Sequence, residues 1–191
     1  MARLMIGLTQ RLECLASKSR LVYWLASRYY TDVVKKEIGL AGITESDNIL
    51  CIGGGVCPFS AILFHQATGA RITVIDNDNA CVPMARRVIE RLGLGARVRV
   101  LCQDGGSPGL SLSEYTVVHF ALQVSPMERV FSRIEKRVAH GTKLLVRRPA
   151  SVFRKLYSQL PGFPVALCRH TVHKKARSIG STMLYVKTIA G

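Results

Sequence analysis

The sequence predicts an α/β protein built on a Rossmann-like sheet of parallel strands, flanked by helices and ending in a C-terminal antiparallel strand hairpin. Three features predict this class. From residue 48 onward, short apolar runs alternate with amphipathic helical segments, which is typical of a parallel sheet covered on both faces. Three glycines in a row follow the first apolar run, and an aspartate follows each of the next two. With 191 residues, of which 48% are hydrophobic, the chain has enough material for one packed domain.

The expected elements follow from periodicity and turn residues. A first helix is predicted over residues 20–38, where apolar residues recur at spacings of three and four. Strands are expected at residues 48–52, 71–75, 97–101, 115–120 and 143–146, and the hairpin at residues 165–172 and 182–188. Further helices are expected to begin at Pro58, just before Val82 and at Ser151.

One helix start carries a specific capping signal. The segment Ser125-Pro126-Met127-Glu128 predicts a capping box in which Ser125 caps a helix that ends at Gly141. For the domain organisation, we expect residues 1–45 to form an N-terminal helical segment. Residues 46–191 are expected to form the ligand-binding domain.

The charge of the chain is strongly positive and unevenly distributed. There are 27 Lys and Arg against 12 Asp and Glu, which gives a formal net charge of +15. Residues 126–191 hold 14 of the basic residues and only 2 of the acidic ones. A field of this sign favours anionic partners such as nucleic acid, phosphates or carboxylates, and solubility alone is the alternative explanation.

Composition also argues against several classes of protein. The six cysteines include no Cys-x-x-Cys pair, so we expect reduced core thiols and neither a zinc ribbon nor a disulfide scaffold. His170 and His173 have no acid partners nearby in the sequence, so no metal site is expected. No apolar run reaches the ~18 residues that a membrane-spanning helix needs. The apolar patch at residues 4–8 is too short for a secretory signal. We therefore expect a cytoplasmic protein without a membrane span, and the oligomeric state stays open.

The turn after the first strand, Gly53-Gly54-Gly55-Val56-Cys57-Pro58, is the first candidate binding element. Sheets of this kind bind ligands beyond the carboxyl ends of their strands. Glycines at such a turn let a ligand approach the backbone without interference from Cβ atoms, and a merely tight turn is the alternative. The last glycine of the dinucleotide fingerprint is replaced here by Pro58, and a lone Gly-x-Gly is weak evidence for that site.

Two acids are expected at the same edge of the sheet. Asp76 ends the second strand, roughly 20 residues after the glycines, where an acid binds ribose hydroxyls in this architecture. Asp104 follows the third strand, and a turn-forming aspartate is its alternative role. Asp78 is interpreted as a cap of the next helix. The glycine turn and the two acids together predict a nucleoside-binding site.

Over about residues 46–190 these features resemble the class I S-adenosylmethionine-dependent methyltransferases. Like them, the chain lacks the third glycine of a dinucleotide site and ends in a strand hairpin instead of a second nucleotide-binding half. The resemblance implies that S-adenosylmethionine is the cofactor, with the glycine turn at its methionine part, Asp76 at its ribose and Asp104 at its adenine amine. The cofactor contacts expected are Ile52, Gly53, Gly54, Gly55, Asp76, Asn77, Asp104, Gly105, Phe120 and Ala121.

A narrower resemblance is to the nicotianamine synthase family. It lies in Ile52-Gly53-Gly54-Gly55-Val56-Cys57-Pro58-Phe59-Ser60, Val130-Phe131-x-x-Ile134, Leu144-Leu145-Val146-Arg147-Arg148 and Arg154-Lys155-Leu156-Tyr157. Enzymes of this family share the methyltransferase fold but transfer the aminocarboxypropyl group of the cofactor. They carry a longer N-terminal helical domain that helps to enclose the acceptor, whereas about 47 residues precede the first strand here.

Polar residues near the same edge are candidates for the acceptor side of the site. A sulfonium is itself a reactive electrophile, so the protein mainly has to align the acceptor and exclude water. His119, near the end of the fourth strand, is the candidate catalytic base, and a core histidine is the alternative. The candidate substrate-binding residues are Tyr30, Gln123, Arg147 and Arg148, the arginines because guanidinium groups bind carboxylates and phosphates.

The sequence therefore predicts an S-adenosylmethionine-dependent transferase, most simply a methyltransferase acting on a small, anionic acceptor. Three alternatives stay open. The first is aminocarboxypropyl transfer of the nicotianamine synthase type. The second is methylation of RNA, which the basic C-terminal third favours, although an aromatic content of 7% gives no evident base-stacking array. The third is a non-catalytic cofactor binder, because a fold alone does not establish activity.

Overall fold

The computed structural model describes residues 20–107, 109–158, 160, 168–174, 176 and 178–188, without the side chains of residues 20–27. Its centre is a seven-stranded sheet in the order β3-β2-β1-β4-β5-β7-β6. The strands are β1 (Asn48–Ile52), β2 (Arg71–Asp76), β3 (Val98–Cys102), β4 (Val117–Phe120), β5 (Lys143–Pro149), β6 (Arg169–Val172) and β7 (Ile179–Val186). Strands β1 to β5 are parallel, and β7 is antiparallel to both β5 and β6. The predicted Rossmann-like sheet with a C-terminal hairpin is confirmed.

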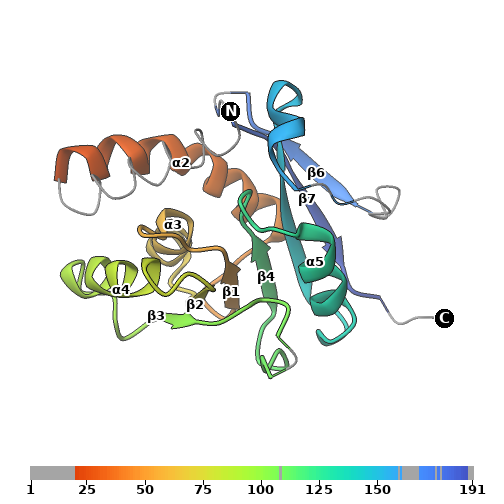
Figure 1. Cartoon of the computed structure of the whole chain (residues 1–191), viewed down its shortest axis with the longest axis horizontal. Helices are drawn as coiled ribbons and strands as arrows, with labels where there is room; N and C mark the ends of the chain where they lie inside the picture. The colour runs from red at the N-terminus through yellow and green to blue at the C-terminus, as the bar shows by residue number, and fades with distance from the viewer. Residues whose placement is uncertain are drawn as a thin grey trace.

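Helices cover both faces of this sheet (Figure 1). The helices α2 (Arg20–Ala41), α3 (Phe59–Thr68) and α4 (Cys81–Arg91) pack on one face, and α5 (Met127–Glu135) packs on the other. Successive residues of a strand point to opposite faces, so Ile49 joins the core under α3 while Leu50 joins the core under α5. This explains why the central strands β1 and β4 are apolar at nearly every position, with Asn48 and His119 as the exceptions.

Most boundaries lie within three residues of the sequence-based prediction. β5 runs on to Pro149 because it pairs with β7 along its whole length, which the apolar pattern of residues 143–146 could not show. The element at Ser151–Leu156, η1, is a 3-10 helix instead of the expected α-helix. The first residues of the predicted strand at 165–172, up to residue 167, lie outside the described residues.

The predicted capping box at Ser125 is wrong. The helix α5 begins at Met127, and Pro126 occupies the N-cap position with extended backbone and no side-chain cap hydrogen bond. Since Ser125 lies one residue before the N-cap, its hydroxyl is not at the capping position. The Met127 N–H instead donates to Ser158 Oγ at 2.8 Å, from the segment that follows η1. The helix also ends at Glu135, well before the expected Gly141.

The cysteines agree with the expectation of core thiols only in part. All five described cysteines are free, and Cys51, Cys57 and Cys81 are buried. Burial raises the pKa of Cys51 to about 12, so this thiol stays protonated. Cys102 is exposed, and its thiol donates to Asn79 Oδ1 at 2.7 Å, so it is not a core residue. Cys14 lies outside the described residues. Within the described part of the chain, no helix is long and apolar enough to span a bilayer.

The cap of α5 gives a direct test of this local structure. Replacing Ser158→Ala removes the acceptor for the Met127 N–H, and losing a helix cap of this kind costs about 1 kcal/mol of stability. Replacing Ser125→Ala is expected to change the free energy of unfolding by less than about 0.5 kcal/mol. Urea unfolding of both variants checks this. A larger loss of unfolding free energy from Ser125→Ala than from Ser158→Ala would show that Ser125 caps the helix after all.

Candidate binding site at the carboxyl edge of the sheet

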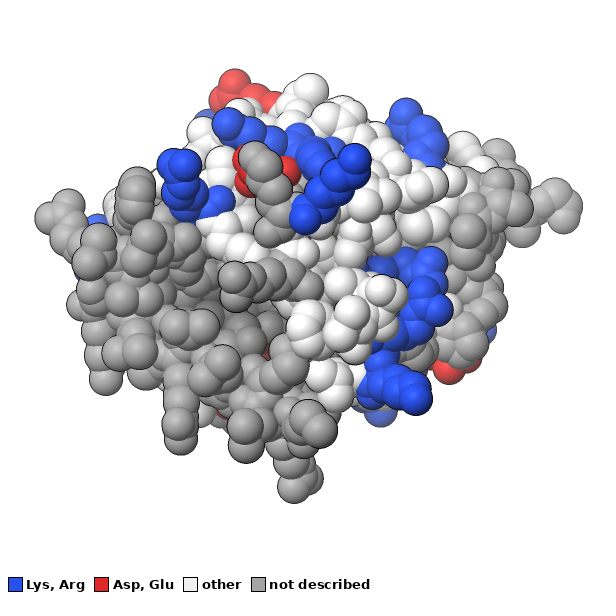
Figure 2. Space-filling view, turned by 90° about the horizontal axis from the view of Figure 1, so that it is seen from above, with Lys and Arg blue, Asp and Glu red and all other residues white. Residues whose placement is uncertain are grey.

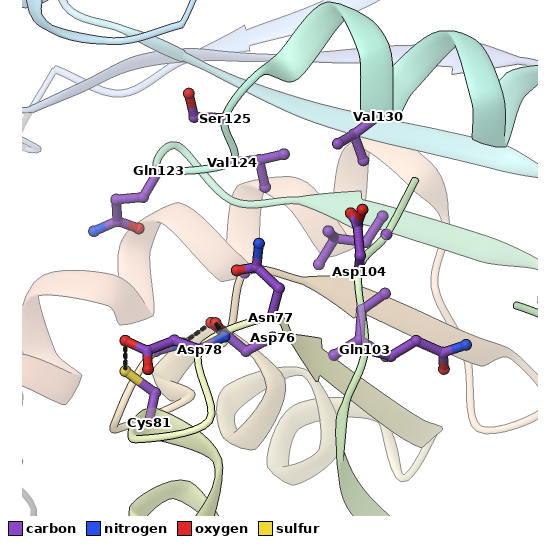
Figure 3. Close-up of a pocket in the computed structure, with 15 residues that line it drawn as sticks. Asp76, Asn77, Asp78, Cys81, Gln103, Asp104, Gln123, Val124, Ser125 and Val130 are labelled. Carbon is purple, nitrogen blue, oxygen red and sulfur yellow. Dashed lines mark hydrogen bonds between the residues drawn. The ribbon is translucent and has the colours of Figure 1, made fainter. Parts of the chain in front are cut away.

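A cavity of about 260 Å³ lies beyond the carboxyl ends of β1, β2 and β3 and is bounded on its other side by the segment between β4 and α5 (Figure 3). Its lining consists of Ile52, Gly53, Gly55, Ile75, Asp76, Asn77, Asp78, Cys81, Gln103, Asp104, Gly105, Gln123, Val124, Ser125 and Val130. Three of these residues are aspartates. Among the residues that the structure describes, no lysine or arginine lines the cavity. The cavity therefore favours a ligand that carries positive charge and hydroxyl groups.

The glycine turn serves packing as well as access. Gly53 and Gly55 have φ angles of +83° and +60°, which side-chain-bearing residues rarely adopt. A Cβ atom on Gly54 would lie 2.3 Å from Val74 Cγ1, so the turn packs directly against β2. Gly53 and Gly55 line the cavity of about 260 Å³. Gly54 lines a second, smaller cavity, which is described below.

Asp76 joins the glycine turn to the cavity. Its Oδ2 accepts a hydrogen bond from the Gly55 N–H at 2.7 Å, and its Oδ1 accepts one from the Asp78 N–H at 3.0 Å. An ionised carboxylate has about four acceptor positions, so about two remain for hydroxyl groups of a ligand. Asn77 follows it and also lines the cavity (Figure 3).

Asp104 and Gly105 line the cavity after β3. The Oδ1 of Asp104 accepts a hydrogen bond from the Gly106 N–H at 2.9 Å, and its Oδ2 lies 3.5 Å from Nη2 of Arg129. A Cβ atom on Gly105 would lie 2.9 Å from Cγ2 of Ile52, so only glycine lets this loop approach the end of β1. Asp104 therefore shapes its own turn, as the alternative interpretation held, and also lines the cavity.

Asp78 has the structural role expected of it, although Ala80 stands at the cap position of α4. The Ala80 N–H donates to Asp78 Oδ1 at 2.8 Å, and the Cys81 thiol donates to Oδ2 at 3.2 Å (Figure 3). These hydrogen bonds hold the pKa of Asp78 below its ordinary value. Both carboxylate oxygens of Asp78 thus serve the start of α4.

The second cavity has a volume of about 30 Å³, which is room for about one water-sized group. Its lining includes Tyr30, Ser60, His119, Ala121 and Arg147. Three residues, Ile52, Gly53 and Gln123, line both cavities and so mark the place where they meet.

Arg147 is buried and already paired. Its Nε and Nη2 donate to the two carboxylate oxygens of Glu37, each at 2.8 Å, and its Nη1 donates to Ser60 Oγ at 2.8 Å. Burial alone would raise the pKa of Glu37, but the charge and hydrogen bonds of Arg147 outweigh it and hold that pKa well below its ordinary value. Because Glu37 neutralises the guanidinium, the expectation that Arg147 anchors an anionic acceptor is not supported. Arg148 is exposed and lines neither of the two cavities.

His119 is a core histidine that also touches the second cavity. It is 1% exposed, its ring lies edge-on to Phe64, and its Nε2 is 3.7 Å from Glu37 Oε2, too far for a hydrogen bond. Burial, and then the charge of Arg147, lower the pKa of His119, so the ring is neutral. Its Nε2 has no hydrogen-bond partner among the described residues. The proposed role as a base stays a prediction.

The remaining predicted contacts divide between the two cavities and the core. Gln123 is exposed at the junction of the cavities, and Ala121 lines the smaller one. Phe120 is fully buried with its ring against Phe131 and lines neither cavity, so the expected cofactor contact is not supported for its side chain.

Sequence reasoning missed Glu37, Ser60, Cys81 and Gln103. One signal for Glu37 was present, because it stands on the apolar face of its helix at a spacing of four from Val33 and from Ala41. An acid in such a position indicates a buried partner.

No family model matches the chain. An L-histidine 2-aminobutanoyltransferase from Yersinia pestis is 26% identical over 120 residues, which cover 62% of this chain and 43% of the relative. The protein of the same name from Pseudomonas aeruginosa is 25% identical over 122 residues, which cover 62% of this chain and 45% of the relative. The matches therefore span less than half the length of these curated relatives.

Solved structures match over more of the chain. A point mutant of MtNAS, a nicotianamine synthase, in complex with S-adenosylmethionine gives a TM-score of 0.80 at 22% identity, covering 97% of this chain and 76% of that one. This chain has the class I S-adenosylmethionine-dependent methyltransferase fold. An RNA methyltransferase from Salinibacter ruber with the same fold gives a TM-score of 0.66 at 20% identity, covering 84% of this chain and 93% of that one. The predicted resemblance, including its nicotianamine synthase-like features, is confirmed at the level of the fold.

The lowered pKa of His119 in this methyltransferase fold makes stability depend on pH. A histidine held neutral by burial is protonated first in the unfolded chain, so stability is lost as the pH falls below the ordinary value of 6.5. We expect His119→Asn to lose less stability than the unmodified chain between about pH 7 and about pH 5. Glu37, whose pKa is lowered, adds a loss only below its ordinary value of 4.5.

Thermal unfolding midpoints across this pH range check the prediction, with the exposed His140→Asn as the matched control. Parallel pH profiles for His119→Asn and the unmodified chain would contradict it.

Proposed function

We propose that the chain is an S-adenosylmethionine-dependent transferase that moves the aminocarboxypropyl group of the cofactor to a small acceptor. The observation that carries the proposal is the acidic cavity at the ends of β1, β2 and β3, lined by Gly53, Asp76 and Asp104. The choice of transferred group is supported by the curated relatives, which are named L-histidine 2-aminobutanoyltransferases, and by the likeness to a nicotianamine synthase.

The residues present fit the proposed cofactor. Asp76 keeps about two acceptor positions for the two ribose hydroxyls, because only two of its acceptor positions are used by backbone N–H groups. Asp104 lines the part of the cavity after β3, where the family resemblance expects the adenine amine. A lining with three aspartates and, in its described residues, no basic side chain suits a sulfonium cation.

S-adenosylmethionine supplies a sulfonium whose carbon–sulfur bond breaks as the acceptor forms a bond to that carbon, so the electron pair of the broken bond stays on sulfur. The protein's part is to hold acceptor and carbon in line and to exclude water. Ile52, Gly53 and Gln123 line both cavities, and this is the place where an acceptor could meet the carbon. Gln123 offers an amide there to orient the acceptor. His119, neutral and facing the smaller cavity, is the proposed recipient of the acceptor's proton.

Methyl transfer is the second candidate, because the same fold and cavity serve it. The RNA methyltransferase match and the net charge of +15 favour an RNA acceptor within this alternative. Among the residues that the structure describes, Figure 2 shows the basic side chains of one face in separate groups. Several described arginines also donate to backbone carbonyls, among them Arg86, Arg133 and Arg137. These observations favour a small acceptor over RNA. The expected anionic character of that acceptor has no support from the two cavities, because Glu37 neutralises Arg147 and Arg148 lines neither of them.

The released product separates the two reactions. Incubation with S-adenosylmethionine and L-histidine is expected to release methylthioadenosine, which chromatography distinguishes from S-adenosylhomocysteine. Release of S-adenosylhomocysteine would instead establish methyl transfer. Release of neither product with any acceptor, despite cofactor binding, would indicate a binder. An affinity for RNA that falls steeply with salt concentration would favour the RNA alternative.

Cofactor binding can be tested apart from turnover. Asp76→Asn is expected to weaken S-adenosylmethionine binding about tenfold or more, because hydrogen bonds to a charged group contribute about 1.5–3 kcal/mol. Glu90→Gln is the matched control, with less than about a threefold effect, since it removes an exposed carboxylate of α4 that lines neither cavity. Isothermal titration calorimetry measures both. Equal affinities for Asp76→Asn and the unmodified chain would remove Asp76 from the cofactor site.

A further inference from the structure

The ion pair between Glu37 and Arg147 lies in the interior, with the two residues 0% and 4% exposed. Taking two charges out of water is expensive, and apolar residues of similar volume often stabilise a protein as well or better. Stability alone therefore gives no reason for charges at these two positions. The residues that contact the ion pair indicate which helices and strands it holds together.

Glu37 fastens the C-terminal half of α2 to two strands at once. Its Oε1 accepts hydrogen bonds from Arg147 Nε on β5 at 2.8 Å and from Thr182 Oγ1 on β7 at 2.7 Å. Its Oε2 accepts a hydrogen bond from Arg147 Nη2 at 2.8 Å. Thr182 Oγ1 also lies 2.8 Å from His173 Nε2. These contacts join residues 110 and 145 positions apart in the sequence.

Arg147 extends this network to the glycine turn. Its Nη1 donates to Ser60 Oγ in the first turn of α3, which follows the glycine turn directly. Its guanidinium carbon lies 5.7 Å from the centre of the Tyr30 ring, within the range of a cation–π contact. The Tyr30 ring in turn stacks on Phe59, with centres 5.5 Å apart and planes 12° from parallel. Tyr30 and Glu37 are about two helical turns apart and so share one face of α2.

We infer that Glu37 is a positioning residue for the acceptor side of the site. Through Arg147 it holds the Tyr30 face of α2 against the start of α3, and this fixes the second cavity where it meets Gly53 and Gln123. Glu37 lines neither cavity itself, so it acts through Arg147 and not on the reactants. The kinetic part of this inference rests on the proposed function, whereas the structural part does not.

The test compares the unmodified chain with variants that differ in charge. Glu37→Leu combined with Arg147→Met removes both charges and leaves an apolar pair, which is expected to fold. Ser60→Ala is a milder variant that removes the hydrogen bond between Arg147 and α3, together with a hydroxyl group that lines the second cavity. Glu114→Gln combined with Arg99→Met removes an exposed pair at 3.0 Å that lines neither cavity, and is the matched control.

Two readouts are measured on each variant. Hydrogen–deuterium exchange is followed in α2 and in residues 53–60, and KM for the acceptor is compared with the dissociation constant for S-adenosylmethionine. In the apolar pair we expect exchange in both segments to rise about tenfold or more and KM to rise by a similar factor, with cofactor affinity changed less than about threefold. Ser60→Ala is expected to raise exchange and KM by a few-fold. The control pair is expected to change neither of them.

Unchanged exchange in α2 and residues 53–60, with unchanged KM, would overturn the inference. Equal losses in cofactor affinity and KM would overturn it as well, since they indicate general loosening of the fold. If the variant with the apolar pair does not fold, the exchange and KM measured for Ser60→Ala test the inference in its place. If the unmodified chain releases no product at all, the proposed function fails, and the exchange measurements still decide whether the pair positions α2.

Discussion

The parallel pairing of β1 with β2 and with β4 is the constraint on which the rest of the molecule depends. Ile52 pairs with Ile75 on one side and with Phe120 on the other, so the loops that follow these strands leave the sheet at the same level. The glycine turn, Asp76 and Gln123 come from three of these loops, although the chain separates them widely. A slip of one residue would turn the buried side chains of a strand to the wrong face, so the two cores hold the site in register.

This constraint explains why much of the fold could be predicted from the sequence. The apolar runs and the glycines are local signals, and the boundaries of β1 agree with the prediction residue for residue. Asp76 and Asp104 could be placed in the site because position at a strand end decides where a residue lies in a parallel sheet. The capping box at Ser125 failed because a local motif competed with Ser158, which lies 31 residues from Met127 in the chain.

The acceptor side could be predicted only in part. Tyr30, His119, Gln123 and Arg147 were expected there and do line the second cavity, but the contacts that neutralise Arg147 depend on residues distant in the sequence. The partners of Arg147 are Glu37 and Ser60, 110 and 87 positions away, and neither spacing carries a local signal. Two adjacent arginines at a strand end look alike in a sequence, yet alternate residues of β5 face opposite sides of the sheet. Arg147 enters the core and is neutralised, whereas Arg148 reaches solvent.

The net charge of the molecule is positive, whereas the charge of the cavity lining is negative. The charge of the lining decides which ligands the cavity favours. The net charge of +15 is spread over the surface, where charges more than about 8 Å from a ligand are largely screened at physiological salt. Inside the cavity, three aspartates are close to any ligand, and Arg129 approaches only Asp104. Arg147 is the one described arginine that lines the smaller cavity, and its pairing with Glu37 cancels its positive charge there. The junction of the cavities is thereby left with an acidic side and an uncharged side. A cationic cofactor is favoured on the first, and on the second an acceptor that arrives without net charge meets no electrostatic barrier.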